Sequence, residues 1–409
     1  MNQCPKEWDL AAHLLWQQGS RQPAIDAVLA LLNKHGPAKP VALVLQLVYY
    51  IFLVGDPASA AAFLEMQRAH HPQHPELLLN LAVCLSLSRQ PGPAVERIHE
   101  LLGLEPDNVV AHDSLCNCLS QLGQFEQAAV AGSRALTLKD LGHRSPPQAW
   151  RLPDARPADW AGAPGKAAVV AFSLWGANPR YLRGAIDNAL MAPQVYPGWT
   201  LRFFVDDSVP AELCRTLKAL GADLVLEPPG QGLRQRLAWR FKVANDPTVG
   251  RFLVRDVDSV VNLRERAAVD EWLASDCWFH VMRDWWTHTD LMLAGMWGGV
   301  AGVLPNLTDL LNNYQPATAE TPNIDQLFLR EKVWACVRQS CLVHDRCFTP
   351  SGASLWPEAD PPGNAHVGQD LFAAGRAAQE ARLAPWLDKL PSLRLASPGP
   401  LSALVAVAA

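Results

Sequence analysis

Hydrophobic and small residues follow one pattern in the first part of the chain and another in the second. Up to residue 140 they repeat with a period near 34 residues, whereas from Lys166 onward short apolar runs alternate with amphipathic segments. The first pattern is typical of helix–turn–helix repeats, and the second is typical of a sheet covered by helices. The 409 residues therefore predict two parts of different architecture.

Pairs of small residues mark the repeats of the first part. A Gly-x4-Ala pair occurs three times, at Gly19/Ala24, Gly55/Ala60 and Gly123/Ala128, and Ala94 continues the series without its glycine. The alanines lie 36, 34 and 34 residues apart. We expect the glycine to form a turn and the alanine to let two helices pack closely. The pattern resembles the tetratricopeptide repeat, which implies an α-helical solenoid. Such a domain is either a helical scaffold or a groove for a protein or peptide, and the pattern leaves this open.

A proline-rich stretch separates the two parts. It contains five prolines and little apolar periodicity, as expected for a linker or an extended wrap, at Pro146, Pro147, Pro153, Pro157 and Pro164. We therefore expect tetratricopeptide-like helical repeats over residues 1–140, a linker over 141–165, an α/β domain over 166–375, and a helical or flexible tail over 376–409.

The second part predicts an α/β domain. Its β-rich runs lie at residues 167–172, 200–205, 222–226, 251–256 and 277–282, and its helical segments at 179–191, 232–244 and 264–275. Alternating strands and helices predict a mainly parallel central sheet with helices on both faces. In such sheets ligands bind at the carboxyl ends of the strands. Asp206 and the Asp256/Asp258 pair lie at such ends.

Two aspartates one residue apart end the strand that starts at Arg251. Residues i and i+2 of a strand point to the same face, so Asp256 and Asp258 are expected to converge. Neighbouring carboxylates repel each other unless a cation lies between them. Mg²⁺ and Mn²⁺ prefer oxygen ligands, typically one or two carboxylates together with substrate phosphates. The strand therefore predicts a site where such a metal binds a phosphate group.

Composition indicates which binding partners and which cellular compartment to expect. With 35 basic and 40 acidic residues, the net charge of −5 gives no reason to expect binding to nucleic acid. The nine cysteines are irregularly spaced, which favours reduced thiols and a cytoplasmic protein. Lys6 and Glu7 precede any apolar run, so no secretory signal is predicted. Residues 41–55 are nearly uncharged but shorter than the ~20 residues of a spanning helix, so we expect a buried helix rather than a transmembrane segment.

Further polar residues follow the aspartates. Arg283 and Asp284 open a polar loop after the strand at 277–282 and could bind sugar hydroxyls or phosphate. Asp325 lies near the start of a short helix, where capping is the alternative interpretation. His344 and His366 each offer an imidazole that could complete a metal shell, although a lone histidine is more often structural.

At this point the second part resembles a bacterial-type, nucleotide-sugar-dependent glycosyltransferase with a GT-A fold. The resemblance covers residues 166 to about 370, and four features carry it: Ser173-Leu-Trp-Gly176, the Asp-x-Asp at Asp256/Asp258, Ala294-Gly295-Met-Trp-Gly298-Gly299, and Asp325-Gln326. It implies that the Asp-x-Asp binds Mn²⁺ or Mg²⁺, which holds the donor diphosphate, and that a C-terminal histidine, His344 or His366, joins the metal.

The resemblance also implies roles for the other residues. The segment with Ser173 and Trp175 would hold the nucleoside, and Gly295 would line the sugar and acceptor pocket. Asp325 would contact donor or acceptor, and Asp325 and Asp284 are the expected catalytic residues. Arginines such as Arg180, Arg240 and Arg255 could bind phosphate oxygens. Most arginines of the chain are expected at the solvated surface, and Arg255, beside the aspartates, is expected to be the exception.

The sequence therefore predicts a metal-dependent hexosyltransferase whose helical repeats recruit a glycan or protein acceptor or another protein partner. A UDP-sugar is the first expectation for the donor, although no residue pattern selects uridine over guanosine, and the stereochemistry stays open. The alternative is a tetratricopeptide-type interaction module with a catalytically idle α/β domain. A phosphoryl-transfer or hydrolytic enzyme ranks last, because the chain has no Gly-x4-Gly-Lys-Ser/Thr sequence.

Overall fold

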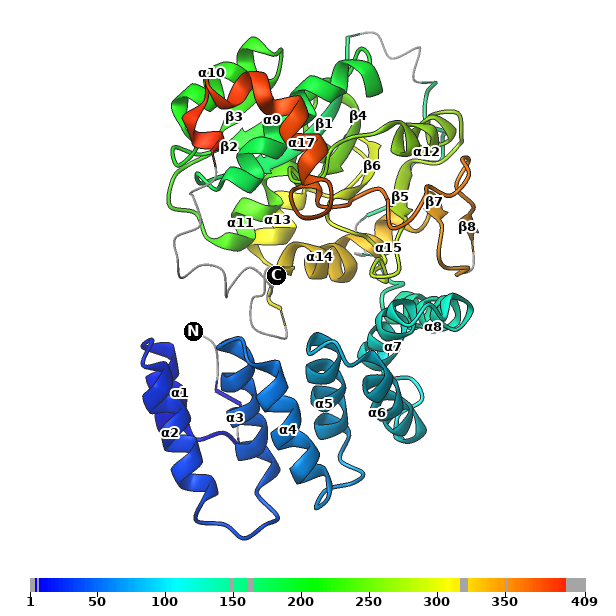
Figure 1. Ribbon diagram of the computed structural model, residues 1–409. Helices are drawn as coiled ribbons and strands as arrows, with labels where there is room; N and C mark the ends of the chain where they lie inside the picture. The colour runs from blue at the N-terminus through cyan, green and yellow to red at the C-terminus, as the bar shows by residue number, and fades with distance from the viewer. Residues whose placement is uncertain are drawn as a thin grey trace. The chain divides into compact units, whose positions relative to one another are not determined.

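The computed structural model describes residues 4–5, 7–146, 150–159, 165–316, 323–350 and 352–394. These residues form two compact units, one ending at Leu138 and the other starting at Lys139. Both can be followed by colour in Figure 1, and each is described by itself.

The first unit consists of helices joined by short turns, and each of the first seven helices packs against its neighbour along the chain (Figure 1). The described residues form four helix pairs: α1 (Leu10–Gln17) with α2 (Arg21–Leu32), α3 (Val41–Leu53) with α4 (Pro57–Arg68), α5 (Pro75–Leu87) with α6 (Pro91–Leu104), and α7 (Val109–Gln121) with α8 (Phe125–Gly142). The predicted helical repeats are therefore present. None of the described helices is long and apolar enough to cross a membrane.

The turns within the pairs explain the spacing of small residues. Gly19, Gly55 and Gly123 have φ angles of 82°, 91° and 74°, a left-handed conformation that favours glycine. The four alanines of the series, Ala24, Ala60, Ala94 and Ala128, are fully buried. In the third pair Arg89 takes the place of the glycine, with φ of 58°. The turn of the third pair thus keeps the left-handed backbone conformation, although arginine replaces glycine there.

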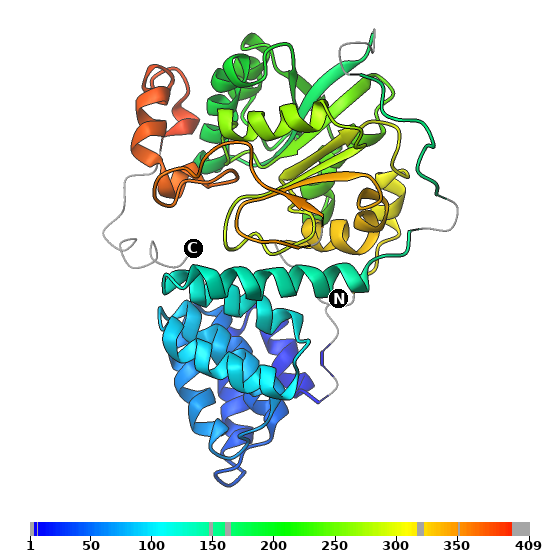
Figure 2. The same ribbon diagram turned by 90° about the vertical axis from the view of Figure 1, so that its right-hand side faces the viewer.

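The second unit is built around one sheet of eight described strands, in the order β3-β2-β1-β4-β6-β5-β7-β8 (Figures 1 and 2). The strands are β1 (Ala167–Leu174), β2 (Thr200–Val205), β3 (Asp223–Leu226), β4 (Val249–Arg255), β5 (Phe279–Arg283), β6 (Met296–Val300), β7 (Cys341–Asp345) and β8 (Ala353–Ser354). β6 runs antiparallel to both of its neighbours, β4 and β5, while the other pairs are parallel.

This arrangement corrects the expectation of a mainly parallel sheet: the sheet is mixed. The difference comes from the Met296–Val300 run, which inserts between β4 and β5. Gly298 and Gly299 make the insertion sterically feasible. A Cβ at Gly298 would lie 2.5 Å from the carbonyl oxygen of Phe252, and one at Gly299 would lie 2.7 Å from the ring of Phe279.

Helices cover both faces of the sheet. One face packs against α9 (Pro179–Val195), α10 (Ala211–Ala219) and α12 (Leu263–Leu273) through a large apolar core. The other face contacts η2 (Trp239–Asn245), which packs with α11 (Leu233–Ala238) and α13 (Leu307–Asn312). The remaining elements are α14 (Ile324–Phe328), η3 (Leu329–Val333), α15 (Trp334–Val337), α16 (Leu371–Ala374), α17 (Arg376–Leu387) and η4 (Pro391–Leu393).

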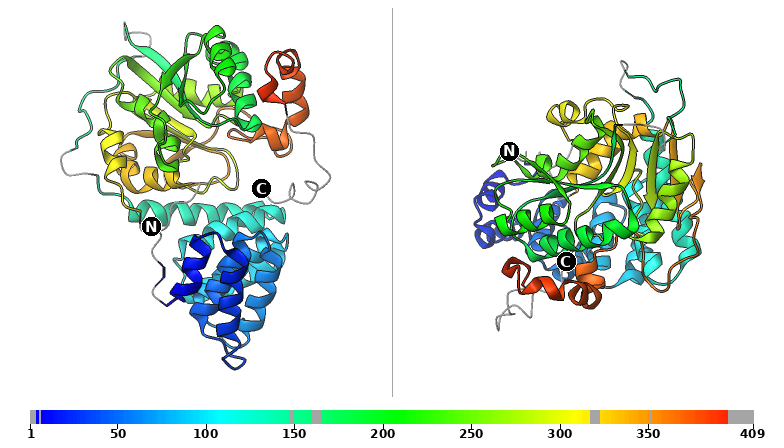
Figure 3. Two further views of the ribbon diagram at one scale, coloured as in Figure 1. Left: turned by 90° about the vertical axis from the view of Figure 1, so that its left-hand side faces the viewer. Right: turned by 90° about the horizontal axis from the view of Figure 1, so that it is seen from above.

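Segments outside the sheet are bound to this unit by buried contacts. In the proline-rich stretch, Trp150 Nε1 donates to the carbonyl of Val303, and Arg251 donates to that of Ala158. At the C-terminal end α17 packs on α9 (Figure 3), where Arg382 forms two hydrogen bonds of 2.8 and 2.7 Å with the buried Asp187. The described part of the expected tail thus contributes to the main core. Residues 395–409 of that tail lie outside the described residues.

Candidate functional site

A pocket of about 370 Å³ opens at the carboxyl ends of β1 and β4. The strand order reverses between these two strands, and in α/β sheets such a reversal leaves a crevice where ligands bind. The pocket is lined by apolar, aromatic and charged residues: Ser173, Leu174, Trp175, Arg180, Tyr181, Leu233, Leu237, Arg240, Asp256, Val257, Asp258, Gly368 and Asp370. Two arginines and three aspartates therefore face one small cavity.

The turn after β4 carries the two predicted aspartates. β4 ends at Arg255, and Asp256 and Asp258 both line the pocket from the turn that follows. Buried Asn188 on α9 holds this turn, because its side-chain amide donates to the carbonyls of Val257 and Ser259 at 3.2 and 3.1 Å. Its Oδ1 accepts the backbone N–H of Val261 at 3.0 Å.

A glycine lets α9 approach the same turn. A Cβ at Gly184 would lie 2.0 Å from the carbonyl oxygen of Val257. Only a residue without a side chain fits there. On the other side, a Cβ at Gly295 would lie 2.0 Å from Asp256 Oδ2, so the absence of a side chain leaves room for that carboxylate.

Arg240 joins three parts of the site. Its guanidinium forms an ion pair with Asp256 through Nη1 and a 3.0 Å ion pair with Asp325 through Nη2. Its backbone N–H donates to Ser173 Oγ at 3.0 Å. The side chain is only 5% exposed, and its Nε has no hydrogen-bond partner among the described residues. Burial raises the pKa of the Asp325 carboxyl.

Arg180 forms ion pairs with the other two aspartates of the pocket. It lies in the first turn of α9, where Asn178 caps the helix. Its Nη2 is 2.6 Å from Asp258 Oδ2 and 3.0 Å from Asp370 Oδ2. Burial, reinforced by the charge of Asp256, raises the pKa of Asp258.

The same contacts test whether a divalent ion fits here. One guanidinium nitrogen lies between two carboxylate oxygens, and it stands in for a cation at that position. Carboxylate oxygens are the ligands that Mg²⁺ and Mn²⁺ prefer. The described residues contain no ready-made group of three or more His, Cys, Asp or Glu ligands. The two carboxylate oxygens fit part of the shell of a hard cation, and the remaining ligands would have to come from a substrate or from water.

The residues expected to hold the nucleoside also meet here. Ser173 Oγ donates to the carbonyl of Leu237 at 3.2 Å, which fixes the end of β1 against α11. Trp175 is half-buried, lines the pocket, and makes an edge-to-face contact with Trp239. The structure thus brings Ser173 and Trp175 together with Arg180, Asp256 and Asp258, and it places Gly295 and Asp325 against that cluster.

Arg255, expected to bind phosphate, lies elsewhere. Its side chain is buried on the opposite face of the sheet, where Nε is 3.1 Å from Glu265 Oε1. Glu265 also accepts a 2.7 Å hydrogen bond from the hydroxyl of Tyr196. Adjacent strand residues point to opposite faces, so Arg255 and Asp256 cannot serve the same site.

Two predicted carboxylates also lie outside the pocket lining. Asp206 is buried, and its Oδ2 is 3.0 Å from Arg236 Nη2. Asp284 is fully buried and forms a two-point ion pair of 3.0 Å contacts with Arg264. Asp284 Oδ2 also accepts the backbone N–H of Val367 at 2.8 Å. Asp284 therefore holds the segment that leads to Gly368 and Asp370.

Neither predicted histidine reaches the aspartates. His344 is buried in β7, with ring nitrogens 2.8 Å from His280 Nε2 and 2.8 Å from Glu271 Oε2. The ring of His366 stacks on Trp285 at 4.6 Å, and its Nδ1 is 2.8 Å from the carbonyl of Asn364. Burial lowers the pKa of both histidines.

Two residues of this site, Asn188 and Asp370, were not predicted from the sequence. Asn188 could have been recognised from the sequence, because an amide on the buried face of an amphipathic helix needs polar partners. Asp370 follows the Gly368 turn and caps α16 by accepting the backbone N–H of Phe372. No feature of the sequence singled out Asp370, and none indicated that Arg240 would be buried.

No protein-family model matches the chain, and no curated protein matches it. Among solved structures, MamA from Desulfovibrio magneticus RS-1 is 18% identical over 31% of this chain and 71% of that chain, with a TM-score of 0.29. An O-GlcNAc transferase mutant from Thermobaculum terrenum is 17% identical, with a TM-score of 0.35, over 60% of this chain and 44% of that chain. At such TM-scores neither likeness carries an argument about function.

Proposed function

We propose that the second unit is a metal-dependent glycosyltransferase that uses a nucleotide-sugar donor. The observation that supports this most is the pocket at the reversal of strand order, where Asp256 and Asp258 face Arg180 and Arg240. A donor with a diphosphate needs positive charge around its phosphates, and a metal bridge needs carboxylates. The pocket offers both types of group.

Asp258 and Asp370 would hold Mn²⁺ or Mg²⁺, with Asp370 in place of a histidine, and the remaining ligands would come from the donor and from water. When bound, such an ion offsets negative charge on a leaving nucleoside diphosphate. Arg240 lines the pocket, which places its guanidinium group where it could donate to a phosphate oxygen. Because Arg240 is buried and bonded to two aspartates, it would bind the phosphate with little loss of side-chain entropy.

The other side of the pocket suits a nucleoside. Trp175 and Tyr181 present aromatic surface beside Leu233 and Leu237, so a base can be covered without selective polar contacts. A UDP-sugar remains our first choice. Asp325 is ion-paired with Arg240, so we assign it to orienting that arginine and leave the catalytic base unassigned. The helical repeats would recruit the acceptor, a glycan or a protein.

Asp258→Asn provides the test, measured as donor hydrolysis or transfer with a panel of nucleotide sugars and Mn²⁺. We expect the variant to lose at least about 100-fold in activity, because the metal loses a charged ligand next to the leaving group. Its thermal unfolding should stay close to that of the unmodified chain. Asp388→Asn is the matched control, since Asp388 is a 90% exposed carboxylate paired with Arg394.

Two results would contradict the proposal. Full activity of Asp258→Asn would remove the metal assignment. Failure of every donor to bind in calorimetry, with and without Mn²⁺, would favour the alternative, an interaction module whose α/β unit is idle.

A further inference from the structure

We propose that Arg180 is an internal competitor of the metal: it occupies Asp258 and Asp370 while the pocket is empty and moves to the donor phosphates when a cation displaces it. This inference rests on the proposed function and adds a regulation of the same site. Its consequence is that metal and nucleotide bind cooperatively.

The contacts of Arg180 are those of a substitute cation. Nε and Nη2 both reach Asp258 Oδ2, at 2.9 and 2.6 Å, and Nη2 reaches Asp370 Oδ2 at 3.0 Å. A divalent ion that used these oxygens would have to displace the guanidinium group. Arg180 and a metal are therefore alternative occupants of one position.

Arg180 is the arginine of the pocket that can move. Its side chain is 34% exposed and extends from the first turn of α9, whereas that of Arg240 is 5% exposed and tied to two aspartates. The guanidinium carbon of Arg180 lies 5.4 Å from the ring centre of Tyr181, which also lines the pocket. A displaced Arg180 therefore stays over the cavity.

The charges of the pocket make the order of binding matter. Four carboxylates, those of Asp256, Asp258, Asp325 and Asp370, are paired with two guanidinium groups, which leaves two negative charges in excess. A diphosphate alone adds to this excess and is repelled, whereas a divalent cation cancels it and frees Arg180. By linkage, each ligand must then raise the affinity for the other by the same factor.

The opposite view is that Arg180 is a fixed latch between α9 and the segment carrying Asp370. The two views differ in the sign of one measurement. If Arg180 competes with the metal, its removal strengthens metal binding in the absence of nucleotide. If it is a latch, its removal loosens the carboxylates and weakens metal binding.

The test is titration of the full chain with Mn²⁺ alone, followed by the paramagnetic resonance of free Mn²⁺ and by calorimetry. We expect Arg180→Ala to bind Mn²⁺ about fivefold more tightly, equivalent to ~1 kcal/mol for a partly exposed ion pair. Arg180→Lys keeps a cation there and should stay within about twofold of the unmodified chain. Arg266→Ala controls for net charge, because Arg266 is 24% exposed and pairs with Asp270 on α12.

A second titration uses UDP and GDP as probes in the presence of saturating Mn²⁺. Here Arg180→Ala should bind the nucleotide about tenfold more weakly, because a charge-assisted contact with phosphate is lost. Mn²⁺ affinity that stays equal or falls in Arg180→Ala overturns the competition while leaving the proposed function standing. Absence of Mn²⁺ binding in every protein overturns the metal-dependent function, and this inference with it.

Discussion

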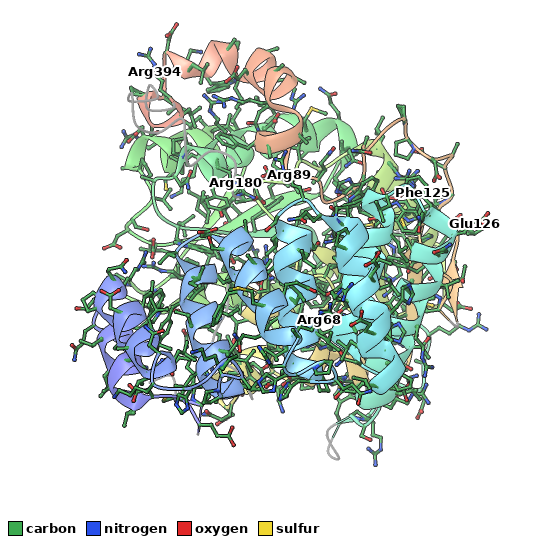
Figure 4. The ribbon with its side chains drawn as sticks, turned by 60° about the horizontal axis from the view of Figure 1, so that its bottom comes forward. Arg68, Arg89, Phe125, Glu126, Arg180 and Arg394 are labelled. Carbon is green, nitrogen blue, oxygen red and sulfur yellow. The ribbon has the colours of Figure 1, made fainter. Side chains whose placement is uncertain are left out.

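Arg89 offers a direct test of the repeat geometry. Among the described residues it is the single non-glycine residue in the left-handed region, with φ of 58°. It is labelled in Figure 4, and its exposed side chain has no ion pair among the described residues. Replacing it with glycine changes the backbone preference and little else. Arg89→Gly should therefore stabilise the chain.

The size of the effect follows from two opposing terms. A residue with a Cβ costs ~1–2 kcal/mol in the left-handed conformation, and glycine removes that penalty. Glycine also gives the unfolded chain more freedom, which lowers stability by ~0.5–1 kcal/mol. The first term is larger, so we expect a net stabilisation of ~0.5–1 kcal/mol. For a unit of this size that corresponds to a rise in the unfolding temperature of about 2–4 °C.

The assay is thermal unfolding of the full chain, followed by far-ultraviolet circular dichroism. Gly123→Arg is the matched reversal: Gly123 occupies the equivalent turn at φ of 74°, and a Cβ there would meet nothing within 4 Å. The stability lost in Gly123→Arg should therefore reflect the backbone conformation alone and amount to ~1–2 kcal/mol. A lower unfolding temperature for Arg89→Gly, or an unchanged one for Gly123→Arg, would refute the reasoning.

Two further predictions concern the second unit. Gly184→Ala should destabilise by ~1–3 kcal/mol and weaken Mn²⁺ binding, because the collision with Val257 outweighs the ~1 kcal/mol gain in helix propensity. Gly103→Ala, in an open position of α6, should show only the gain. For His288, burial lowers the pKa to about 3, so the unfolded state binds its proton first as the pH falls below 6.5. The protonation of His288 in the unfolded state should lower the free energy of unfolding by ~2 kcal/mol between pH 7 and pH 5. This decrease should be absent in His288→Gln. An equal pH dependence of stability in both proteins would contradict the prediction.

Local patterns predicted the elements better than they predicted the sheet. Period and composition located both halves, the turns of the repeats and most strands up to Met282. They could not give the direction of Met296–Val300, because an isolated apolar run with two glycines carries no information about its partners. The insertion of this strand depends on the aromatic rings of Phe252 and Phe279, because a Cβ at Gly299 would collide with them. Long-range packing thus made the sheet mixed.

The arginines near the aspartates show which contacts strand alternation can predict and which it cannot. Strand alternation alone separates Arg255 from Asp256, so the residue next to the aspartates was the wrong choice for a shared site. Arg240 lies 16 residues before Asp256, on η2, and its burial depends on how η2 packs on the sheet. No periodicity of a short segment reports such a contact.

A single helix sets the geometry of the candidate site. α9 supplies Arg180 itself, and it braces the turn of Asp258 through Gly184 and Asn188. One position before Asn188, the buried Asp187 anchors α17, the helix that follows the segment with Asp370. Both carboxylate partners of Arg180 are therefore positioned from the helix that carries it. Buried polar residues on one apolar helix face are costly unless each has a partner. In α9 the buried Asn188 bonds to the turn that carries Asp258, whereas Arg183 and Asp187 bond to η4 and α17, so this polar face joins the turn and the C-terminal helices to one helix.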